Sequence, residues 1–278
     1  MADFPPPSSL EATAANLHEN APTNTYAAID VKDLRKDYGG AFAVDGLSIV
    51  VPQGCFFGFL GPNGAGKTTT IRMLTGLVAP TSGEINILGM RVPEDAYEVR
   101  RLIGIVPDDT LLFDHLTGFE YLQFVGRMYG LSRDLAVQRS RELLTLFELA
   151  QEQRKLVGEY SKGMRKRLAM GAALIHRPKL FLMDEPFEGV DAVGARLMKD
   201  ILLEQVQRGA TVFLTSHVLE VVERLCDRLA IINHGKMVVE GTMSELRTQA
   251  TEEAGTLEDI FVRLVGADRS PIEKLSWL

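Results

Sequence analysis

The sequence is poor in the features that mark secreted, nucleic-acid-binding and disulfide-rich proteins. Its 278 residues include two cysteines, Cys55 and Cys226, which lie far apart beside apolar neighbours. This spacing favours buried, reduced thiols over a disulfide scaffold or a metal site. Aromatic residues make up only 7%, and Lys+Arg 30 against Asp+Glu 37 leaves a net charge of −7. The chain therefore has no overall attraction for nucleic acid or for an anionic membrane.

Long uninterrupted hydrophobic runs are also missing. The longest uncharged stretch covers residues 46–66, but Pro52, Pro62 and repeated glycines interrupt it, which excludes a membrane-spanning helix there. Residues 1–25 have neither a basic region nor an apolar core, so they predict no export signal. Because they are rich in Pro, Ser, Ala and Asn, we expect a disordered leader. These absences predict a protein that stays in the cytoplasm.

What the sequence does contain is the pattern of a globular α/β protein, with 46% apolar and 24% charged residues. Short apolar runs alternate with amphipathic ones, which predicts a sheet covered by helices on both faces. We expect strands over 27–34, 43–51, 55–60, 179–184 and 210–217, helices over 67–77 and 134–149, and a hairpin over 228–241 that turns at His234 and Gly235.

The middle of the chain differs from its flanks. Between about 109 and 177 the sequence has little strand character, and Thr117 and Glu120 form the pattern of a capping box before an apolar helix. A second such box at Thr242 and Glu245 predicts another helix, and a last helix is expected from Thr256. We therefore predict one domain over 26–266, a helical lobe inserted at 109–177, and a tail over 267–278.

One glycine-rich segment carries a specific chemical prediction. Residues 61–69 read GPNGAGKTT, which matches G-x-x-x-x-G-K-[ST], and they lie between an apolar strand and a helix. Glycines let backbone N–H groups converge on phosphate oxygens, and the helix start adds the positive end of its dipole. The predicted phosphate-binding residues are Gly61, Pro62, Asn63, Gly64, Ala65, Gly66, Lys67, Thr68 and Thr69. Lys67 would neutralise the β and γ phosphates, Thr68 would bind Mg²⁺, and Thr69 would reach the α phosphate.

Two adjacent acids end the apolar strand predicted over 179–184. Side chains alternate along a strand, so Asp184 and Glu185 are expected to point in different directions at the sheet edge where α/β proteins bind ligands. Asp184 would hold Mg²⁺ through water, and Glu185 would polarise an attacking water. A purely structural strand end is the alternative, but so apolar a strand does not need two acids there.

With GPNGAGKTT, LFLMDEP and TSH in this order, the chain resembles the ATP-binding subunits of ABC transporters from about residue 26 to 266. The resemblance implies a mixed-sheet core with flanking helices, an antiparallel β subdomain and an inserted helical subdomain. It also implies that Tyr38 stacks on adenine and that His217 contacts the γ phosphate. For Tyr38 the alternative is a core or sheet-edge tyrosine, and for His217 a structural histidine.

The family's signature motif, usually LSGGQ, completes the ATP site of a partner subunit in a head-to-tail dimer. The corresponding residues here are Ser161, Lys162, Gly163 and Met164, and Ser161 also suits the N-cap of a helix. Lys162 is followed by further cations at 165–167, all near the positive end of that helix. Either Glu159 or the partner's γ phosphate would offset them. We favour the phosphate for Ser161, Gly163 and Lys162, and solvated or structural roles for the other cations.

Asp108 is the main departure from the family pattern. The resemblance places a magnesium-binding glutamine after Pro107, whereas this chain has a carboxylate, which binds Mg²⁺ as a charge but cannot donate a hydrogen bond. Hydrolysis would then be slower or coupled differently, unless Asp108 only begins a turn and Asp109 or water serves instead. Asp191 aligns with an aspartate of the family's dimer loop and also suits a helix N-cap.

Together these residues predict an ATPase subunit that uses ATP and Mg²⁺, pairs with itself or with a paralogue, and drives export through separate membrane permeases. The YSKGM form of the signature resembles that of exporters whose membrane half is a separate polypeptide. Such a subunit would sit on the cytoplasmic face of the membrane and would not bind nucleic acid. Two alternatives are a soluble ABC ATPase acting on ribosomes or DNA, and an ATP sensor with little turnover.

Overall fold

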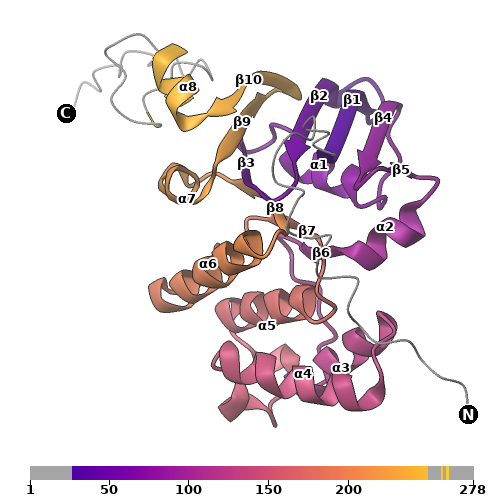
Figure 1. Cartoon of the computed structure of the whole chain (residues 1–278), viewed down its shortest axis with the longest axis vertical. Coiled ribbons are helices and arrows are strands. Elements are labelled where there is room, and N and C mark those ends of the chain that lie inside the picture. The colour runs from indigo at the N-terminus through magenta and orange to yellow at the C-terminus, as the bar shows by residue number, and fades with distance from the viewer. Residues whose placement is uncertain (1–26, 250–257, 259–260, 263–278) are drawn as a thin grey trace, which may run out of the picture.

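The computed structural model of the chain describes residues 27–249, 258 and 261–262 (Figure 1). The expected leader over 1–25 and the expected tail over 267–278 lie outside these residues. So does the helix expected from Thr256, except for Glu258, Phe261 and Val262. Within the described part of the chain, no helix is both long and apolar enough to cross a membrane.

Two sheets of different kinds form the fold. The smaller one is antiparallel and has the order β2-β1-β4-β5, from β1 (Ala27–Asp37), β2 (Phe42–Pro52), β4 (Ser82–Ile87) and β5 (Met90–Val92). The larger has the order β10-β9-β3-β8-β7-β6, from β3 (Phe56–Leu60), β6 (Ile103–Val106), β7 (Leu180–Asp184), β8 (Thr211–Ser216), β9 (Arg228–Asn233) and β10 (Lys236–Thr242). All of its pairings are parallel except that of β9 with β10. The α/β class and the antiparallel subdomain implied by the resemblance are confirmed.

The large sheet is buried because its central strands are mostly apolar. Every residue of β3, β7 and β8 is buried, and Phe57 of β3 stacks on Phe213 of β8 with ring centroids 5.7 Å apart. Parallel strands covered on both faces need such continuous apolar runs. Strand β3 lies between β8 and β9. Because β3, β8 and β7 run parallel, their carboxyl ends lie at the same edge of the sheet.

Helices cover the sheets, and several of them begin directly after a predicted capping residue. They are α1 (Lys67–Leu74), α2 (Ala96–Leu102), α3 (Gly118–Met128), α4 (Arg133–Leu146), α5 (Lys162–Leu174), α6 (Ala192–Gln207), α7 (Leu219–Leu225) and α8 (Met243–Gln249). Both halves of the capping box at Thr117 and Glu120 are formed before α3, and the same pair of bonds joins Thr242 and Glu245. The capping-box predictions are confirmed.

Residues 109–177 contain α3, α4, two short 3₁₀ turns over Ala150–Glu152 and Val157–Glu159, and α5. Figure 1 shows α3 and α4 on the far side of α5 from the large sheet. Leu168 and Met170 of α5 share one core with Phe181 of β7 and with Leu122 of α3. Helix α5 thus joins these helices to the large sheet. The exact bounds of a helical subdomain remain a prediction.

Some elements were not anticipated from the sequence. These are β4, β5, α2 and β6 over 82–106, and the short helix α7. Their segments are brief, and β4 is exposed over its first three residues. Neither the helical nor the strand spacing of apolar residues is therefore sustained long enough to be recognised. They are held by pairing: β4 lies against β1, and β6 against β7.

The predicted hairpin turn at His234 and Gly235 is confirmed, with both residues at positive φ. Its backbone also reaches two distant segments. The N–H of Gly235 donates to the carbonyl of Ala65 at 3.0 Å, and the N–H of Asp45 donates to the carbonyl of Gly235 at 2.8 Å. The turn therefore fastens the glycine-rich loop to strand β2.

Candidate active site

The glycine-rich loop connects β3 to α1, as the motif predicted, and two of its glycines are required by close packing. A Cβ on Gly61 would lie 2.4 Å from the carbonyl oxygen of Ile232, and one on Gly66 would lie 2.3 Å from that of Ala43. Gly66 also has φ 107, which favours glycine. The loop can therefore fold tightly against β2 and β9 only with glycine at these positions.

Helix α1 begins at Lys67 without a capping side chain. Its N-cap residue, Gly66, has no side chain to accept a hydrogen bond from the N–H groups of the first turn. The buried Lys67 ammonium donates to the carbonyls of Gly61 at 2.7 Å and Pro62 at 3.2 Å. Burial lowers the pKa of Lys67, while the nearby carboxylates, above all Glu185, oppose this shift. A helix start and a cation thus meet at one point, an arrangement suited to a phosphate group.

The two predicted acids stand at the carboxyl end of β7. Asp184 is its last residue and pairs with Thr215 of β8, whose hydroxyl donates to the Asp184 carboxylate. The same hydroxyl accepts a hydrogen bond from the backbone N–H of Glu185 at 3.2 Å. The chain turns at Glu185, where φ is 46, so the two side chains diverge as expected.

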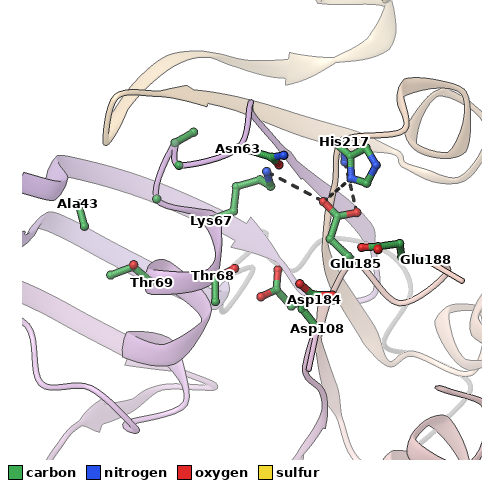
Figure 2. A pocket seen from close by; sticks show the side chains of 13 residues that line it. Ala43, Asn63, Lys67, Thr68, Thr69, Asp108, Asp184, Glu185, Glu188 and His217 are labelled. Carbon is green, nitrogen blue, oxygen red and sulfur yellow. Dashed lines mark hydrogen bonds and ion pairs between the residues drawn. The ribbon is translucent and has the colours of Figure 1, made fainter. Parts of the chain in front are cut away.

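His217 completes the group by its contact with Glu185. Its Nδ1 lies 2.9 Å from Glu185 Oε1, and its backbone N–H donates to Oε2 at 3.4 Å. On the other side, Glu185 Oε1 lies 4.0 Å from the Lys67 ammonium. Figure 2 shows the Glu185 side chain between those of Lys67 and His217. The carboxylate is therefore held between the phosphate loop and the histidine.

Lys67, both acids and His217 line one cavity of about 580 Å³ (Figure 2). Its walls include most of the predicted phosphate loop, namely residues 63–69, together with Asp108, Asp184, Glu185 and His217. Ala43 and Glu188 also line it, although the sequence did not single them out. Glu188 follows Glu185 by three residues in the same turn, and that proximity to the acid pair was the available signal. Thr215 was missed as well, because one threonine in an apolar strand gives no signal.

The residues predicted to hold Mg²⁺ also meet in this cavity. Thr68, Asp108 and Asp184 all line it, and Figure 2 shows the Asp108 and Asp184 side chains next to each other. Among the described residues, no three His, Cys, Asp or Glu side chains form a ready metal site. Magnesium commonly takes one or two carboxylates, waters and substrate phosphates, and these oxygen donors fit that pattern.

The signature segment begins helix α5. Ser161 is its N-cap and accepts from the N–H of Met164 at 3.2 Å, while Lys162 is paired with Glu188 at 2.7 Å. Glu159, one of the two alternatives for offsetting the cations, accepts from the N–H of Leu156, and other carboxylates pair with these cations. The carboxylates of Glu188, Asp114, Asp108 and Glu148 pair with Lys162, Arg165, Lys166 and Arg167 respectively.

Tyr38 and Asp191 occupy less central positions. Tyr38 follows β1 and is 56% exposed, with the Lys36 ammonium 5.1 Å from its ring centroid, so the core alternative is wrong. Its ring is not among the groups that line the cavity. Asp191 caps α6 by accepting from the N–H groups of Val193 and Gly194, which confirms the predicted N-cap.

Both cysteines are free thiols, as the sequence predicted. Cys55 is buried and Cys226 nearly so, and neither forms a disulfide. Burial raises the pKa of Cys55 to about 11 and that of Cys226 well above its ordinary value. Neither thiol is suited to act as a nucleophile at neutral pH.

Comparison with known proteins agrees with this geometry. The family described as ABC transporter matches residues 44–188. The linearmycin resistance ATP-binding protein LnrL of Bacillus subtilis is 39% identical over 218 residues, which cover 78% of this chain and 70% of LnrL. The daunorubicin resistance ATP-binding protein DrrA3 of Streptomyces coeruleorubidus is 40% identical over 239 residues, which cover 86% of this chain and 75% of DrrA3. A solved ATP-binding subunit of an ABC transporter superposes with a TM-score of 0.80 at 32% identity, over 85% of this chain and 99% of that one. The chain therefore belongs to the ABC transporter family and is one of its ATP-binding, ATP-hydrolysing subunits.

Proposed function

We propose that two copies of this chain, or one copy and a paralogue, enclose two Mg-ATP molecules and power export through separate membrane permeases. The observation that carries the proposal is the meeting of Lys67, Asp184, Glu185 and His217 in one cavity. Relatives named for drug resistance and a bacitracin transport ATP-binding protein support the direction of transport. The working position is the cytoplasmic face of the membrane.

The phosphate chain of ATP lies along the glycine loop. Lys67 and the start of α1 hold the β and γ phosphates, and Thr69 reaches the α phosphate. Tyr38 is exposed enough to stack on adenine. Thr68, Asp108 and Asp184 would hold Mg²⁺, which would supply positive charge to neutralise and orient the phosphates.

Hydrolysis uses the groups around Glu185. Its carboxylate accepts a proton from the attacking water as the water oxygen bonds to the γ phosphorus. The bond from that phosphorus to the bridging oxygen breaks, and its electron pair leaves on ADP. His217 stabilises the γ phosphate, and Lys67 neutralises the charge that develops on it. The side chain of Glu185 is oriented for this task by His217 and by the backbone bond to Thr215.

The partner subunit completes each site with the start of its α5. Ser161 offers a hydroxyl and an adjoining helix start, and Gly163 leaves room for close approach. Lys162 is bound to Glu188 of its own chain, so its contact with a partner's phosphate requires this ion pair to open. Met164 and the loop at Asp191 lie beside this contact and belong to the dimer interface.

The permease docks on the apolar surface near the start of α3. Leu111 is 90% exposed, and Phe113, Phe124 and Met128 are also exposed. Leu111, Phe124 and Met128 line one hollow. Phe113 packs edge-on against Phe124 with centroids 5.3 Å apart, so the surface is a connected patch. Exposed apolar patches of this kind mark interaction sites.

The test is to trap the ATP-bound dimer. Glu185→Gln keeps the shape of the side chain but cannot accept the water's proton, so ATP should hold the subunits together. Size-exclusion chromatography should then show a dimer in Mg-ATP and a monomer without nucleotide. The matched control is Glu185→Gln combined with Lys67→Ala, which should stay monomeric. A single variant that remains monomeric in ATP would refute the mechanism.

A second function, ATP sensing with little turnover, is favoured by one observation. Asp108 adds a fourth acid to a cavity that already contains Asp184, Glu185 and Glu188. Excess negative charge opposes the approach of a γ phosphate. A steady-state assay with the permease present separates the two functions. Phosphate release no faster than that of Lys67→Ala would favour the sensor.

A further inference from the structure

Lys166 is the one lysine among the described residues whose side chain is wholly buried. It lies in the second turn of α5, five residues after the N-cap Ser161. Burying an ammonium group is unfavourable by several kcal/mol unless hydrogen bonds and an opposite charge compensate. A lysine in this position therefore needs specific partners.

The ammonium finds those partners on two different elements. Its Nζ lies 3.1 Å from the carbonyl oxygen of Glu185, 3.5 Å from that of Asp184, and 3.2 Å from that of Pro107. The first two carbonyls belong to the end of β7, and the third to the loop after β6. One side chain thus links the signature helix to both walls of the cavity.

The charge of Lys166 is balanced by Asp108. In the described part of the chain, Asp108 is the one carboxylate within ion-pair distance, with Oδ1 3.6 Å from Nζ. Burial lowers the pKa of Lys166, and Asp108 is the strongest influence that opposes this shift. Asp108 itself is 44% exposed and lines the cavity, so it can face either Lys166 or a bound cation.

The balance of charge in the cavity gives this pair a role. Four acids line the cavity, whereas Lys67 is the one lysine or arginine on its walls. Glu188 is already neutralised by Lys162. Without Lys166 behind it, Asp108 would add an uncompensated negative charge next to Asp184.

We propose that Lys166 is the structural counter-ion of Asp108, and that the two residues act as a matched pair that sets how strongly the cavity holds Mg²⁺. Lys166 is a positioning residue, because it acts through Asp108 and through the backbone at Glu185. The inference rests on the proposed function, since Mg-ATP is what Asp108 would face. It also explains why a carboxylate is tolerated at this position of the catalytic cavity.

A double-mutant cycle tests the pairing. The chains are wild type, Asp108→Gln, Lys166→Met and the double variant, each measured by thermal unfolding and by Mg²⁺ titration with a fluorescent ATP analogue. Asp108→Gln should lower the thermal midpoint of the native chain by about 2–4 °C, because Lys166 loses its counter-ion. The same change on the Lys166→Met background should leave the midpoint unchanged. Coupled pairs show such non-additivity, and independent ones do not.

Magnesium binding should show the same coupling. Asp108→Gln should raise the Mg²⁺ concentration for half-saturation only slightly in the native chain, where Lys166 already shields the carboxylate. On the Lys166→Met background the increase should be about tenfold larger, equivalent to about 1.4 kcal/mol of coupling. The control is Asp108→Glu, which keeps the charge and should stay close to wild type in both measurements. Additive effects in both measurements would overturn the proposal.

The cycle remains decisive if a variant does not fold. Recovery of folding in the double variant after failure of Lys166→Met would support the pairing. If neither Lys166→Met chain folds, equal midpoints for Asp108→Gln and Asp108→Glu would overturn it, and a lower midpoint for Asp108→Gln alone would support it. A wild-type chain that does not bind the Mg-nucleotide would refute the proposed function instead, and the unfolding cycle would still decide the pairing.

Discussion

Thr215 offers the sharpest test of how the catalytic acids are held. Its buried hydroxyl donates to the Asp184 carboxylate and accepts from the Glu185 N–H at 3.2 Å. Thr215→Val keeps the shape of the side chain but removes both bonds. Hydrogen bonds to a charged group contribute about 1.5–3 kcal/mol, and leaving a buried N–H unpaired costs about 1–3 kcal/mol. Unfolding free energy should therefore fall by about 2.5–6 kcal/mol.

The catalytic effect should exceed what lower stability alone produces. If Glu185 shifts by about 1 Å, kcat should fall by about a hundredfold, with little change in KM for ATP. Thr215→Ser keeps the hydroxyl and should restore most of kcat. Steady-state phosphate release, measured well below the unfolding temperature, gives these values.

Thr211 provides a matched control in the same strand. It is also buried, and its hydroxyl accepts from the N–H of Gly54 at 2.9 Å, at the opposite end of β8 from the acids. Thr211→Val should lower stability by about 1–2 kcal/mol and leave kcat unchanged. A Thr215→Val enzyme whose kcat equals that of Thr211→Val would show that the hydroxyl does not position the acids.

Three further outcomes are expected. Burial lowers the pKa of His176 to about 4, so the unfolded chain takes up this proton at a higher pH than the native chain does. The free energy of unfolding, measured in urea, should therefore fall by up to about 3 kcal/mol as the pH drops from about 6.5 to 4. A His176→Asn chain that shows the same fall would contradict this. Cys55, whose pKa is raised to about 11, should react with iodoacetamide far more slowly in the native state than in urea, as mass spectrometry would show. Gly66→Ala places a Cβ against the carbonyl of Ala43 and should abolish ATP binding in a fluorescence titration, whereas Gly54→Ala, at φ 70 but in open space, should not.

The sequence was informative wherever function depends on residues that are close together. The glycine loop needs glycine at Gly61 and Gly66 because backbone carbonyls approach there, and this requirement is written in consecutive residues. The acid pair at the end of β7 and both capping boxes are equally local. For that reason the class of fold, the phosphate loop and the helix starts could be predicted.

The sequence was uninformative where partners are distant. Lys166 is part of a basic run that suits a solvated helix face, and nothing nearby indicates that it is buried against Asp108. The pairing of Lys162 with Glu188 and the two bonds of Thr215 also depend on how β7, β8 and α5 pack. Charge compensation around the cavity is thus a property of tertiary structure, which a short motif does not record.

The position of β3 has a consequence for synthesis on the ribosome. The strand that leads into the phosphate loop pairs with β8 and β9, and the loop itself is held by the turn at Gly235. A nascent chain that ends before residue 211 contains the whole loop sequence but none of these neighbours. Long-range pairing of this kind completes late in folding. The chain should therefore bind nucleotide only after the hairpin of β9 and β10 has emerged from the ribosome. Shorter nascent chains would not bind ATP.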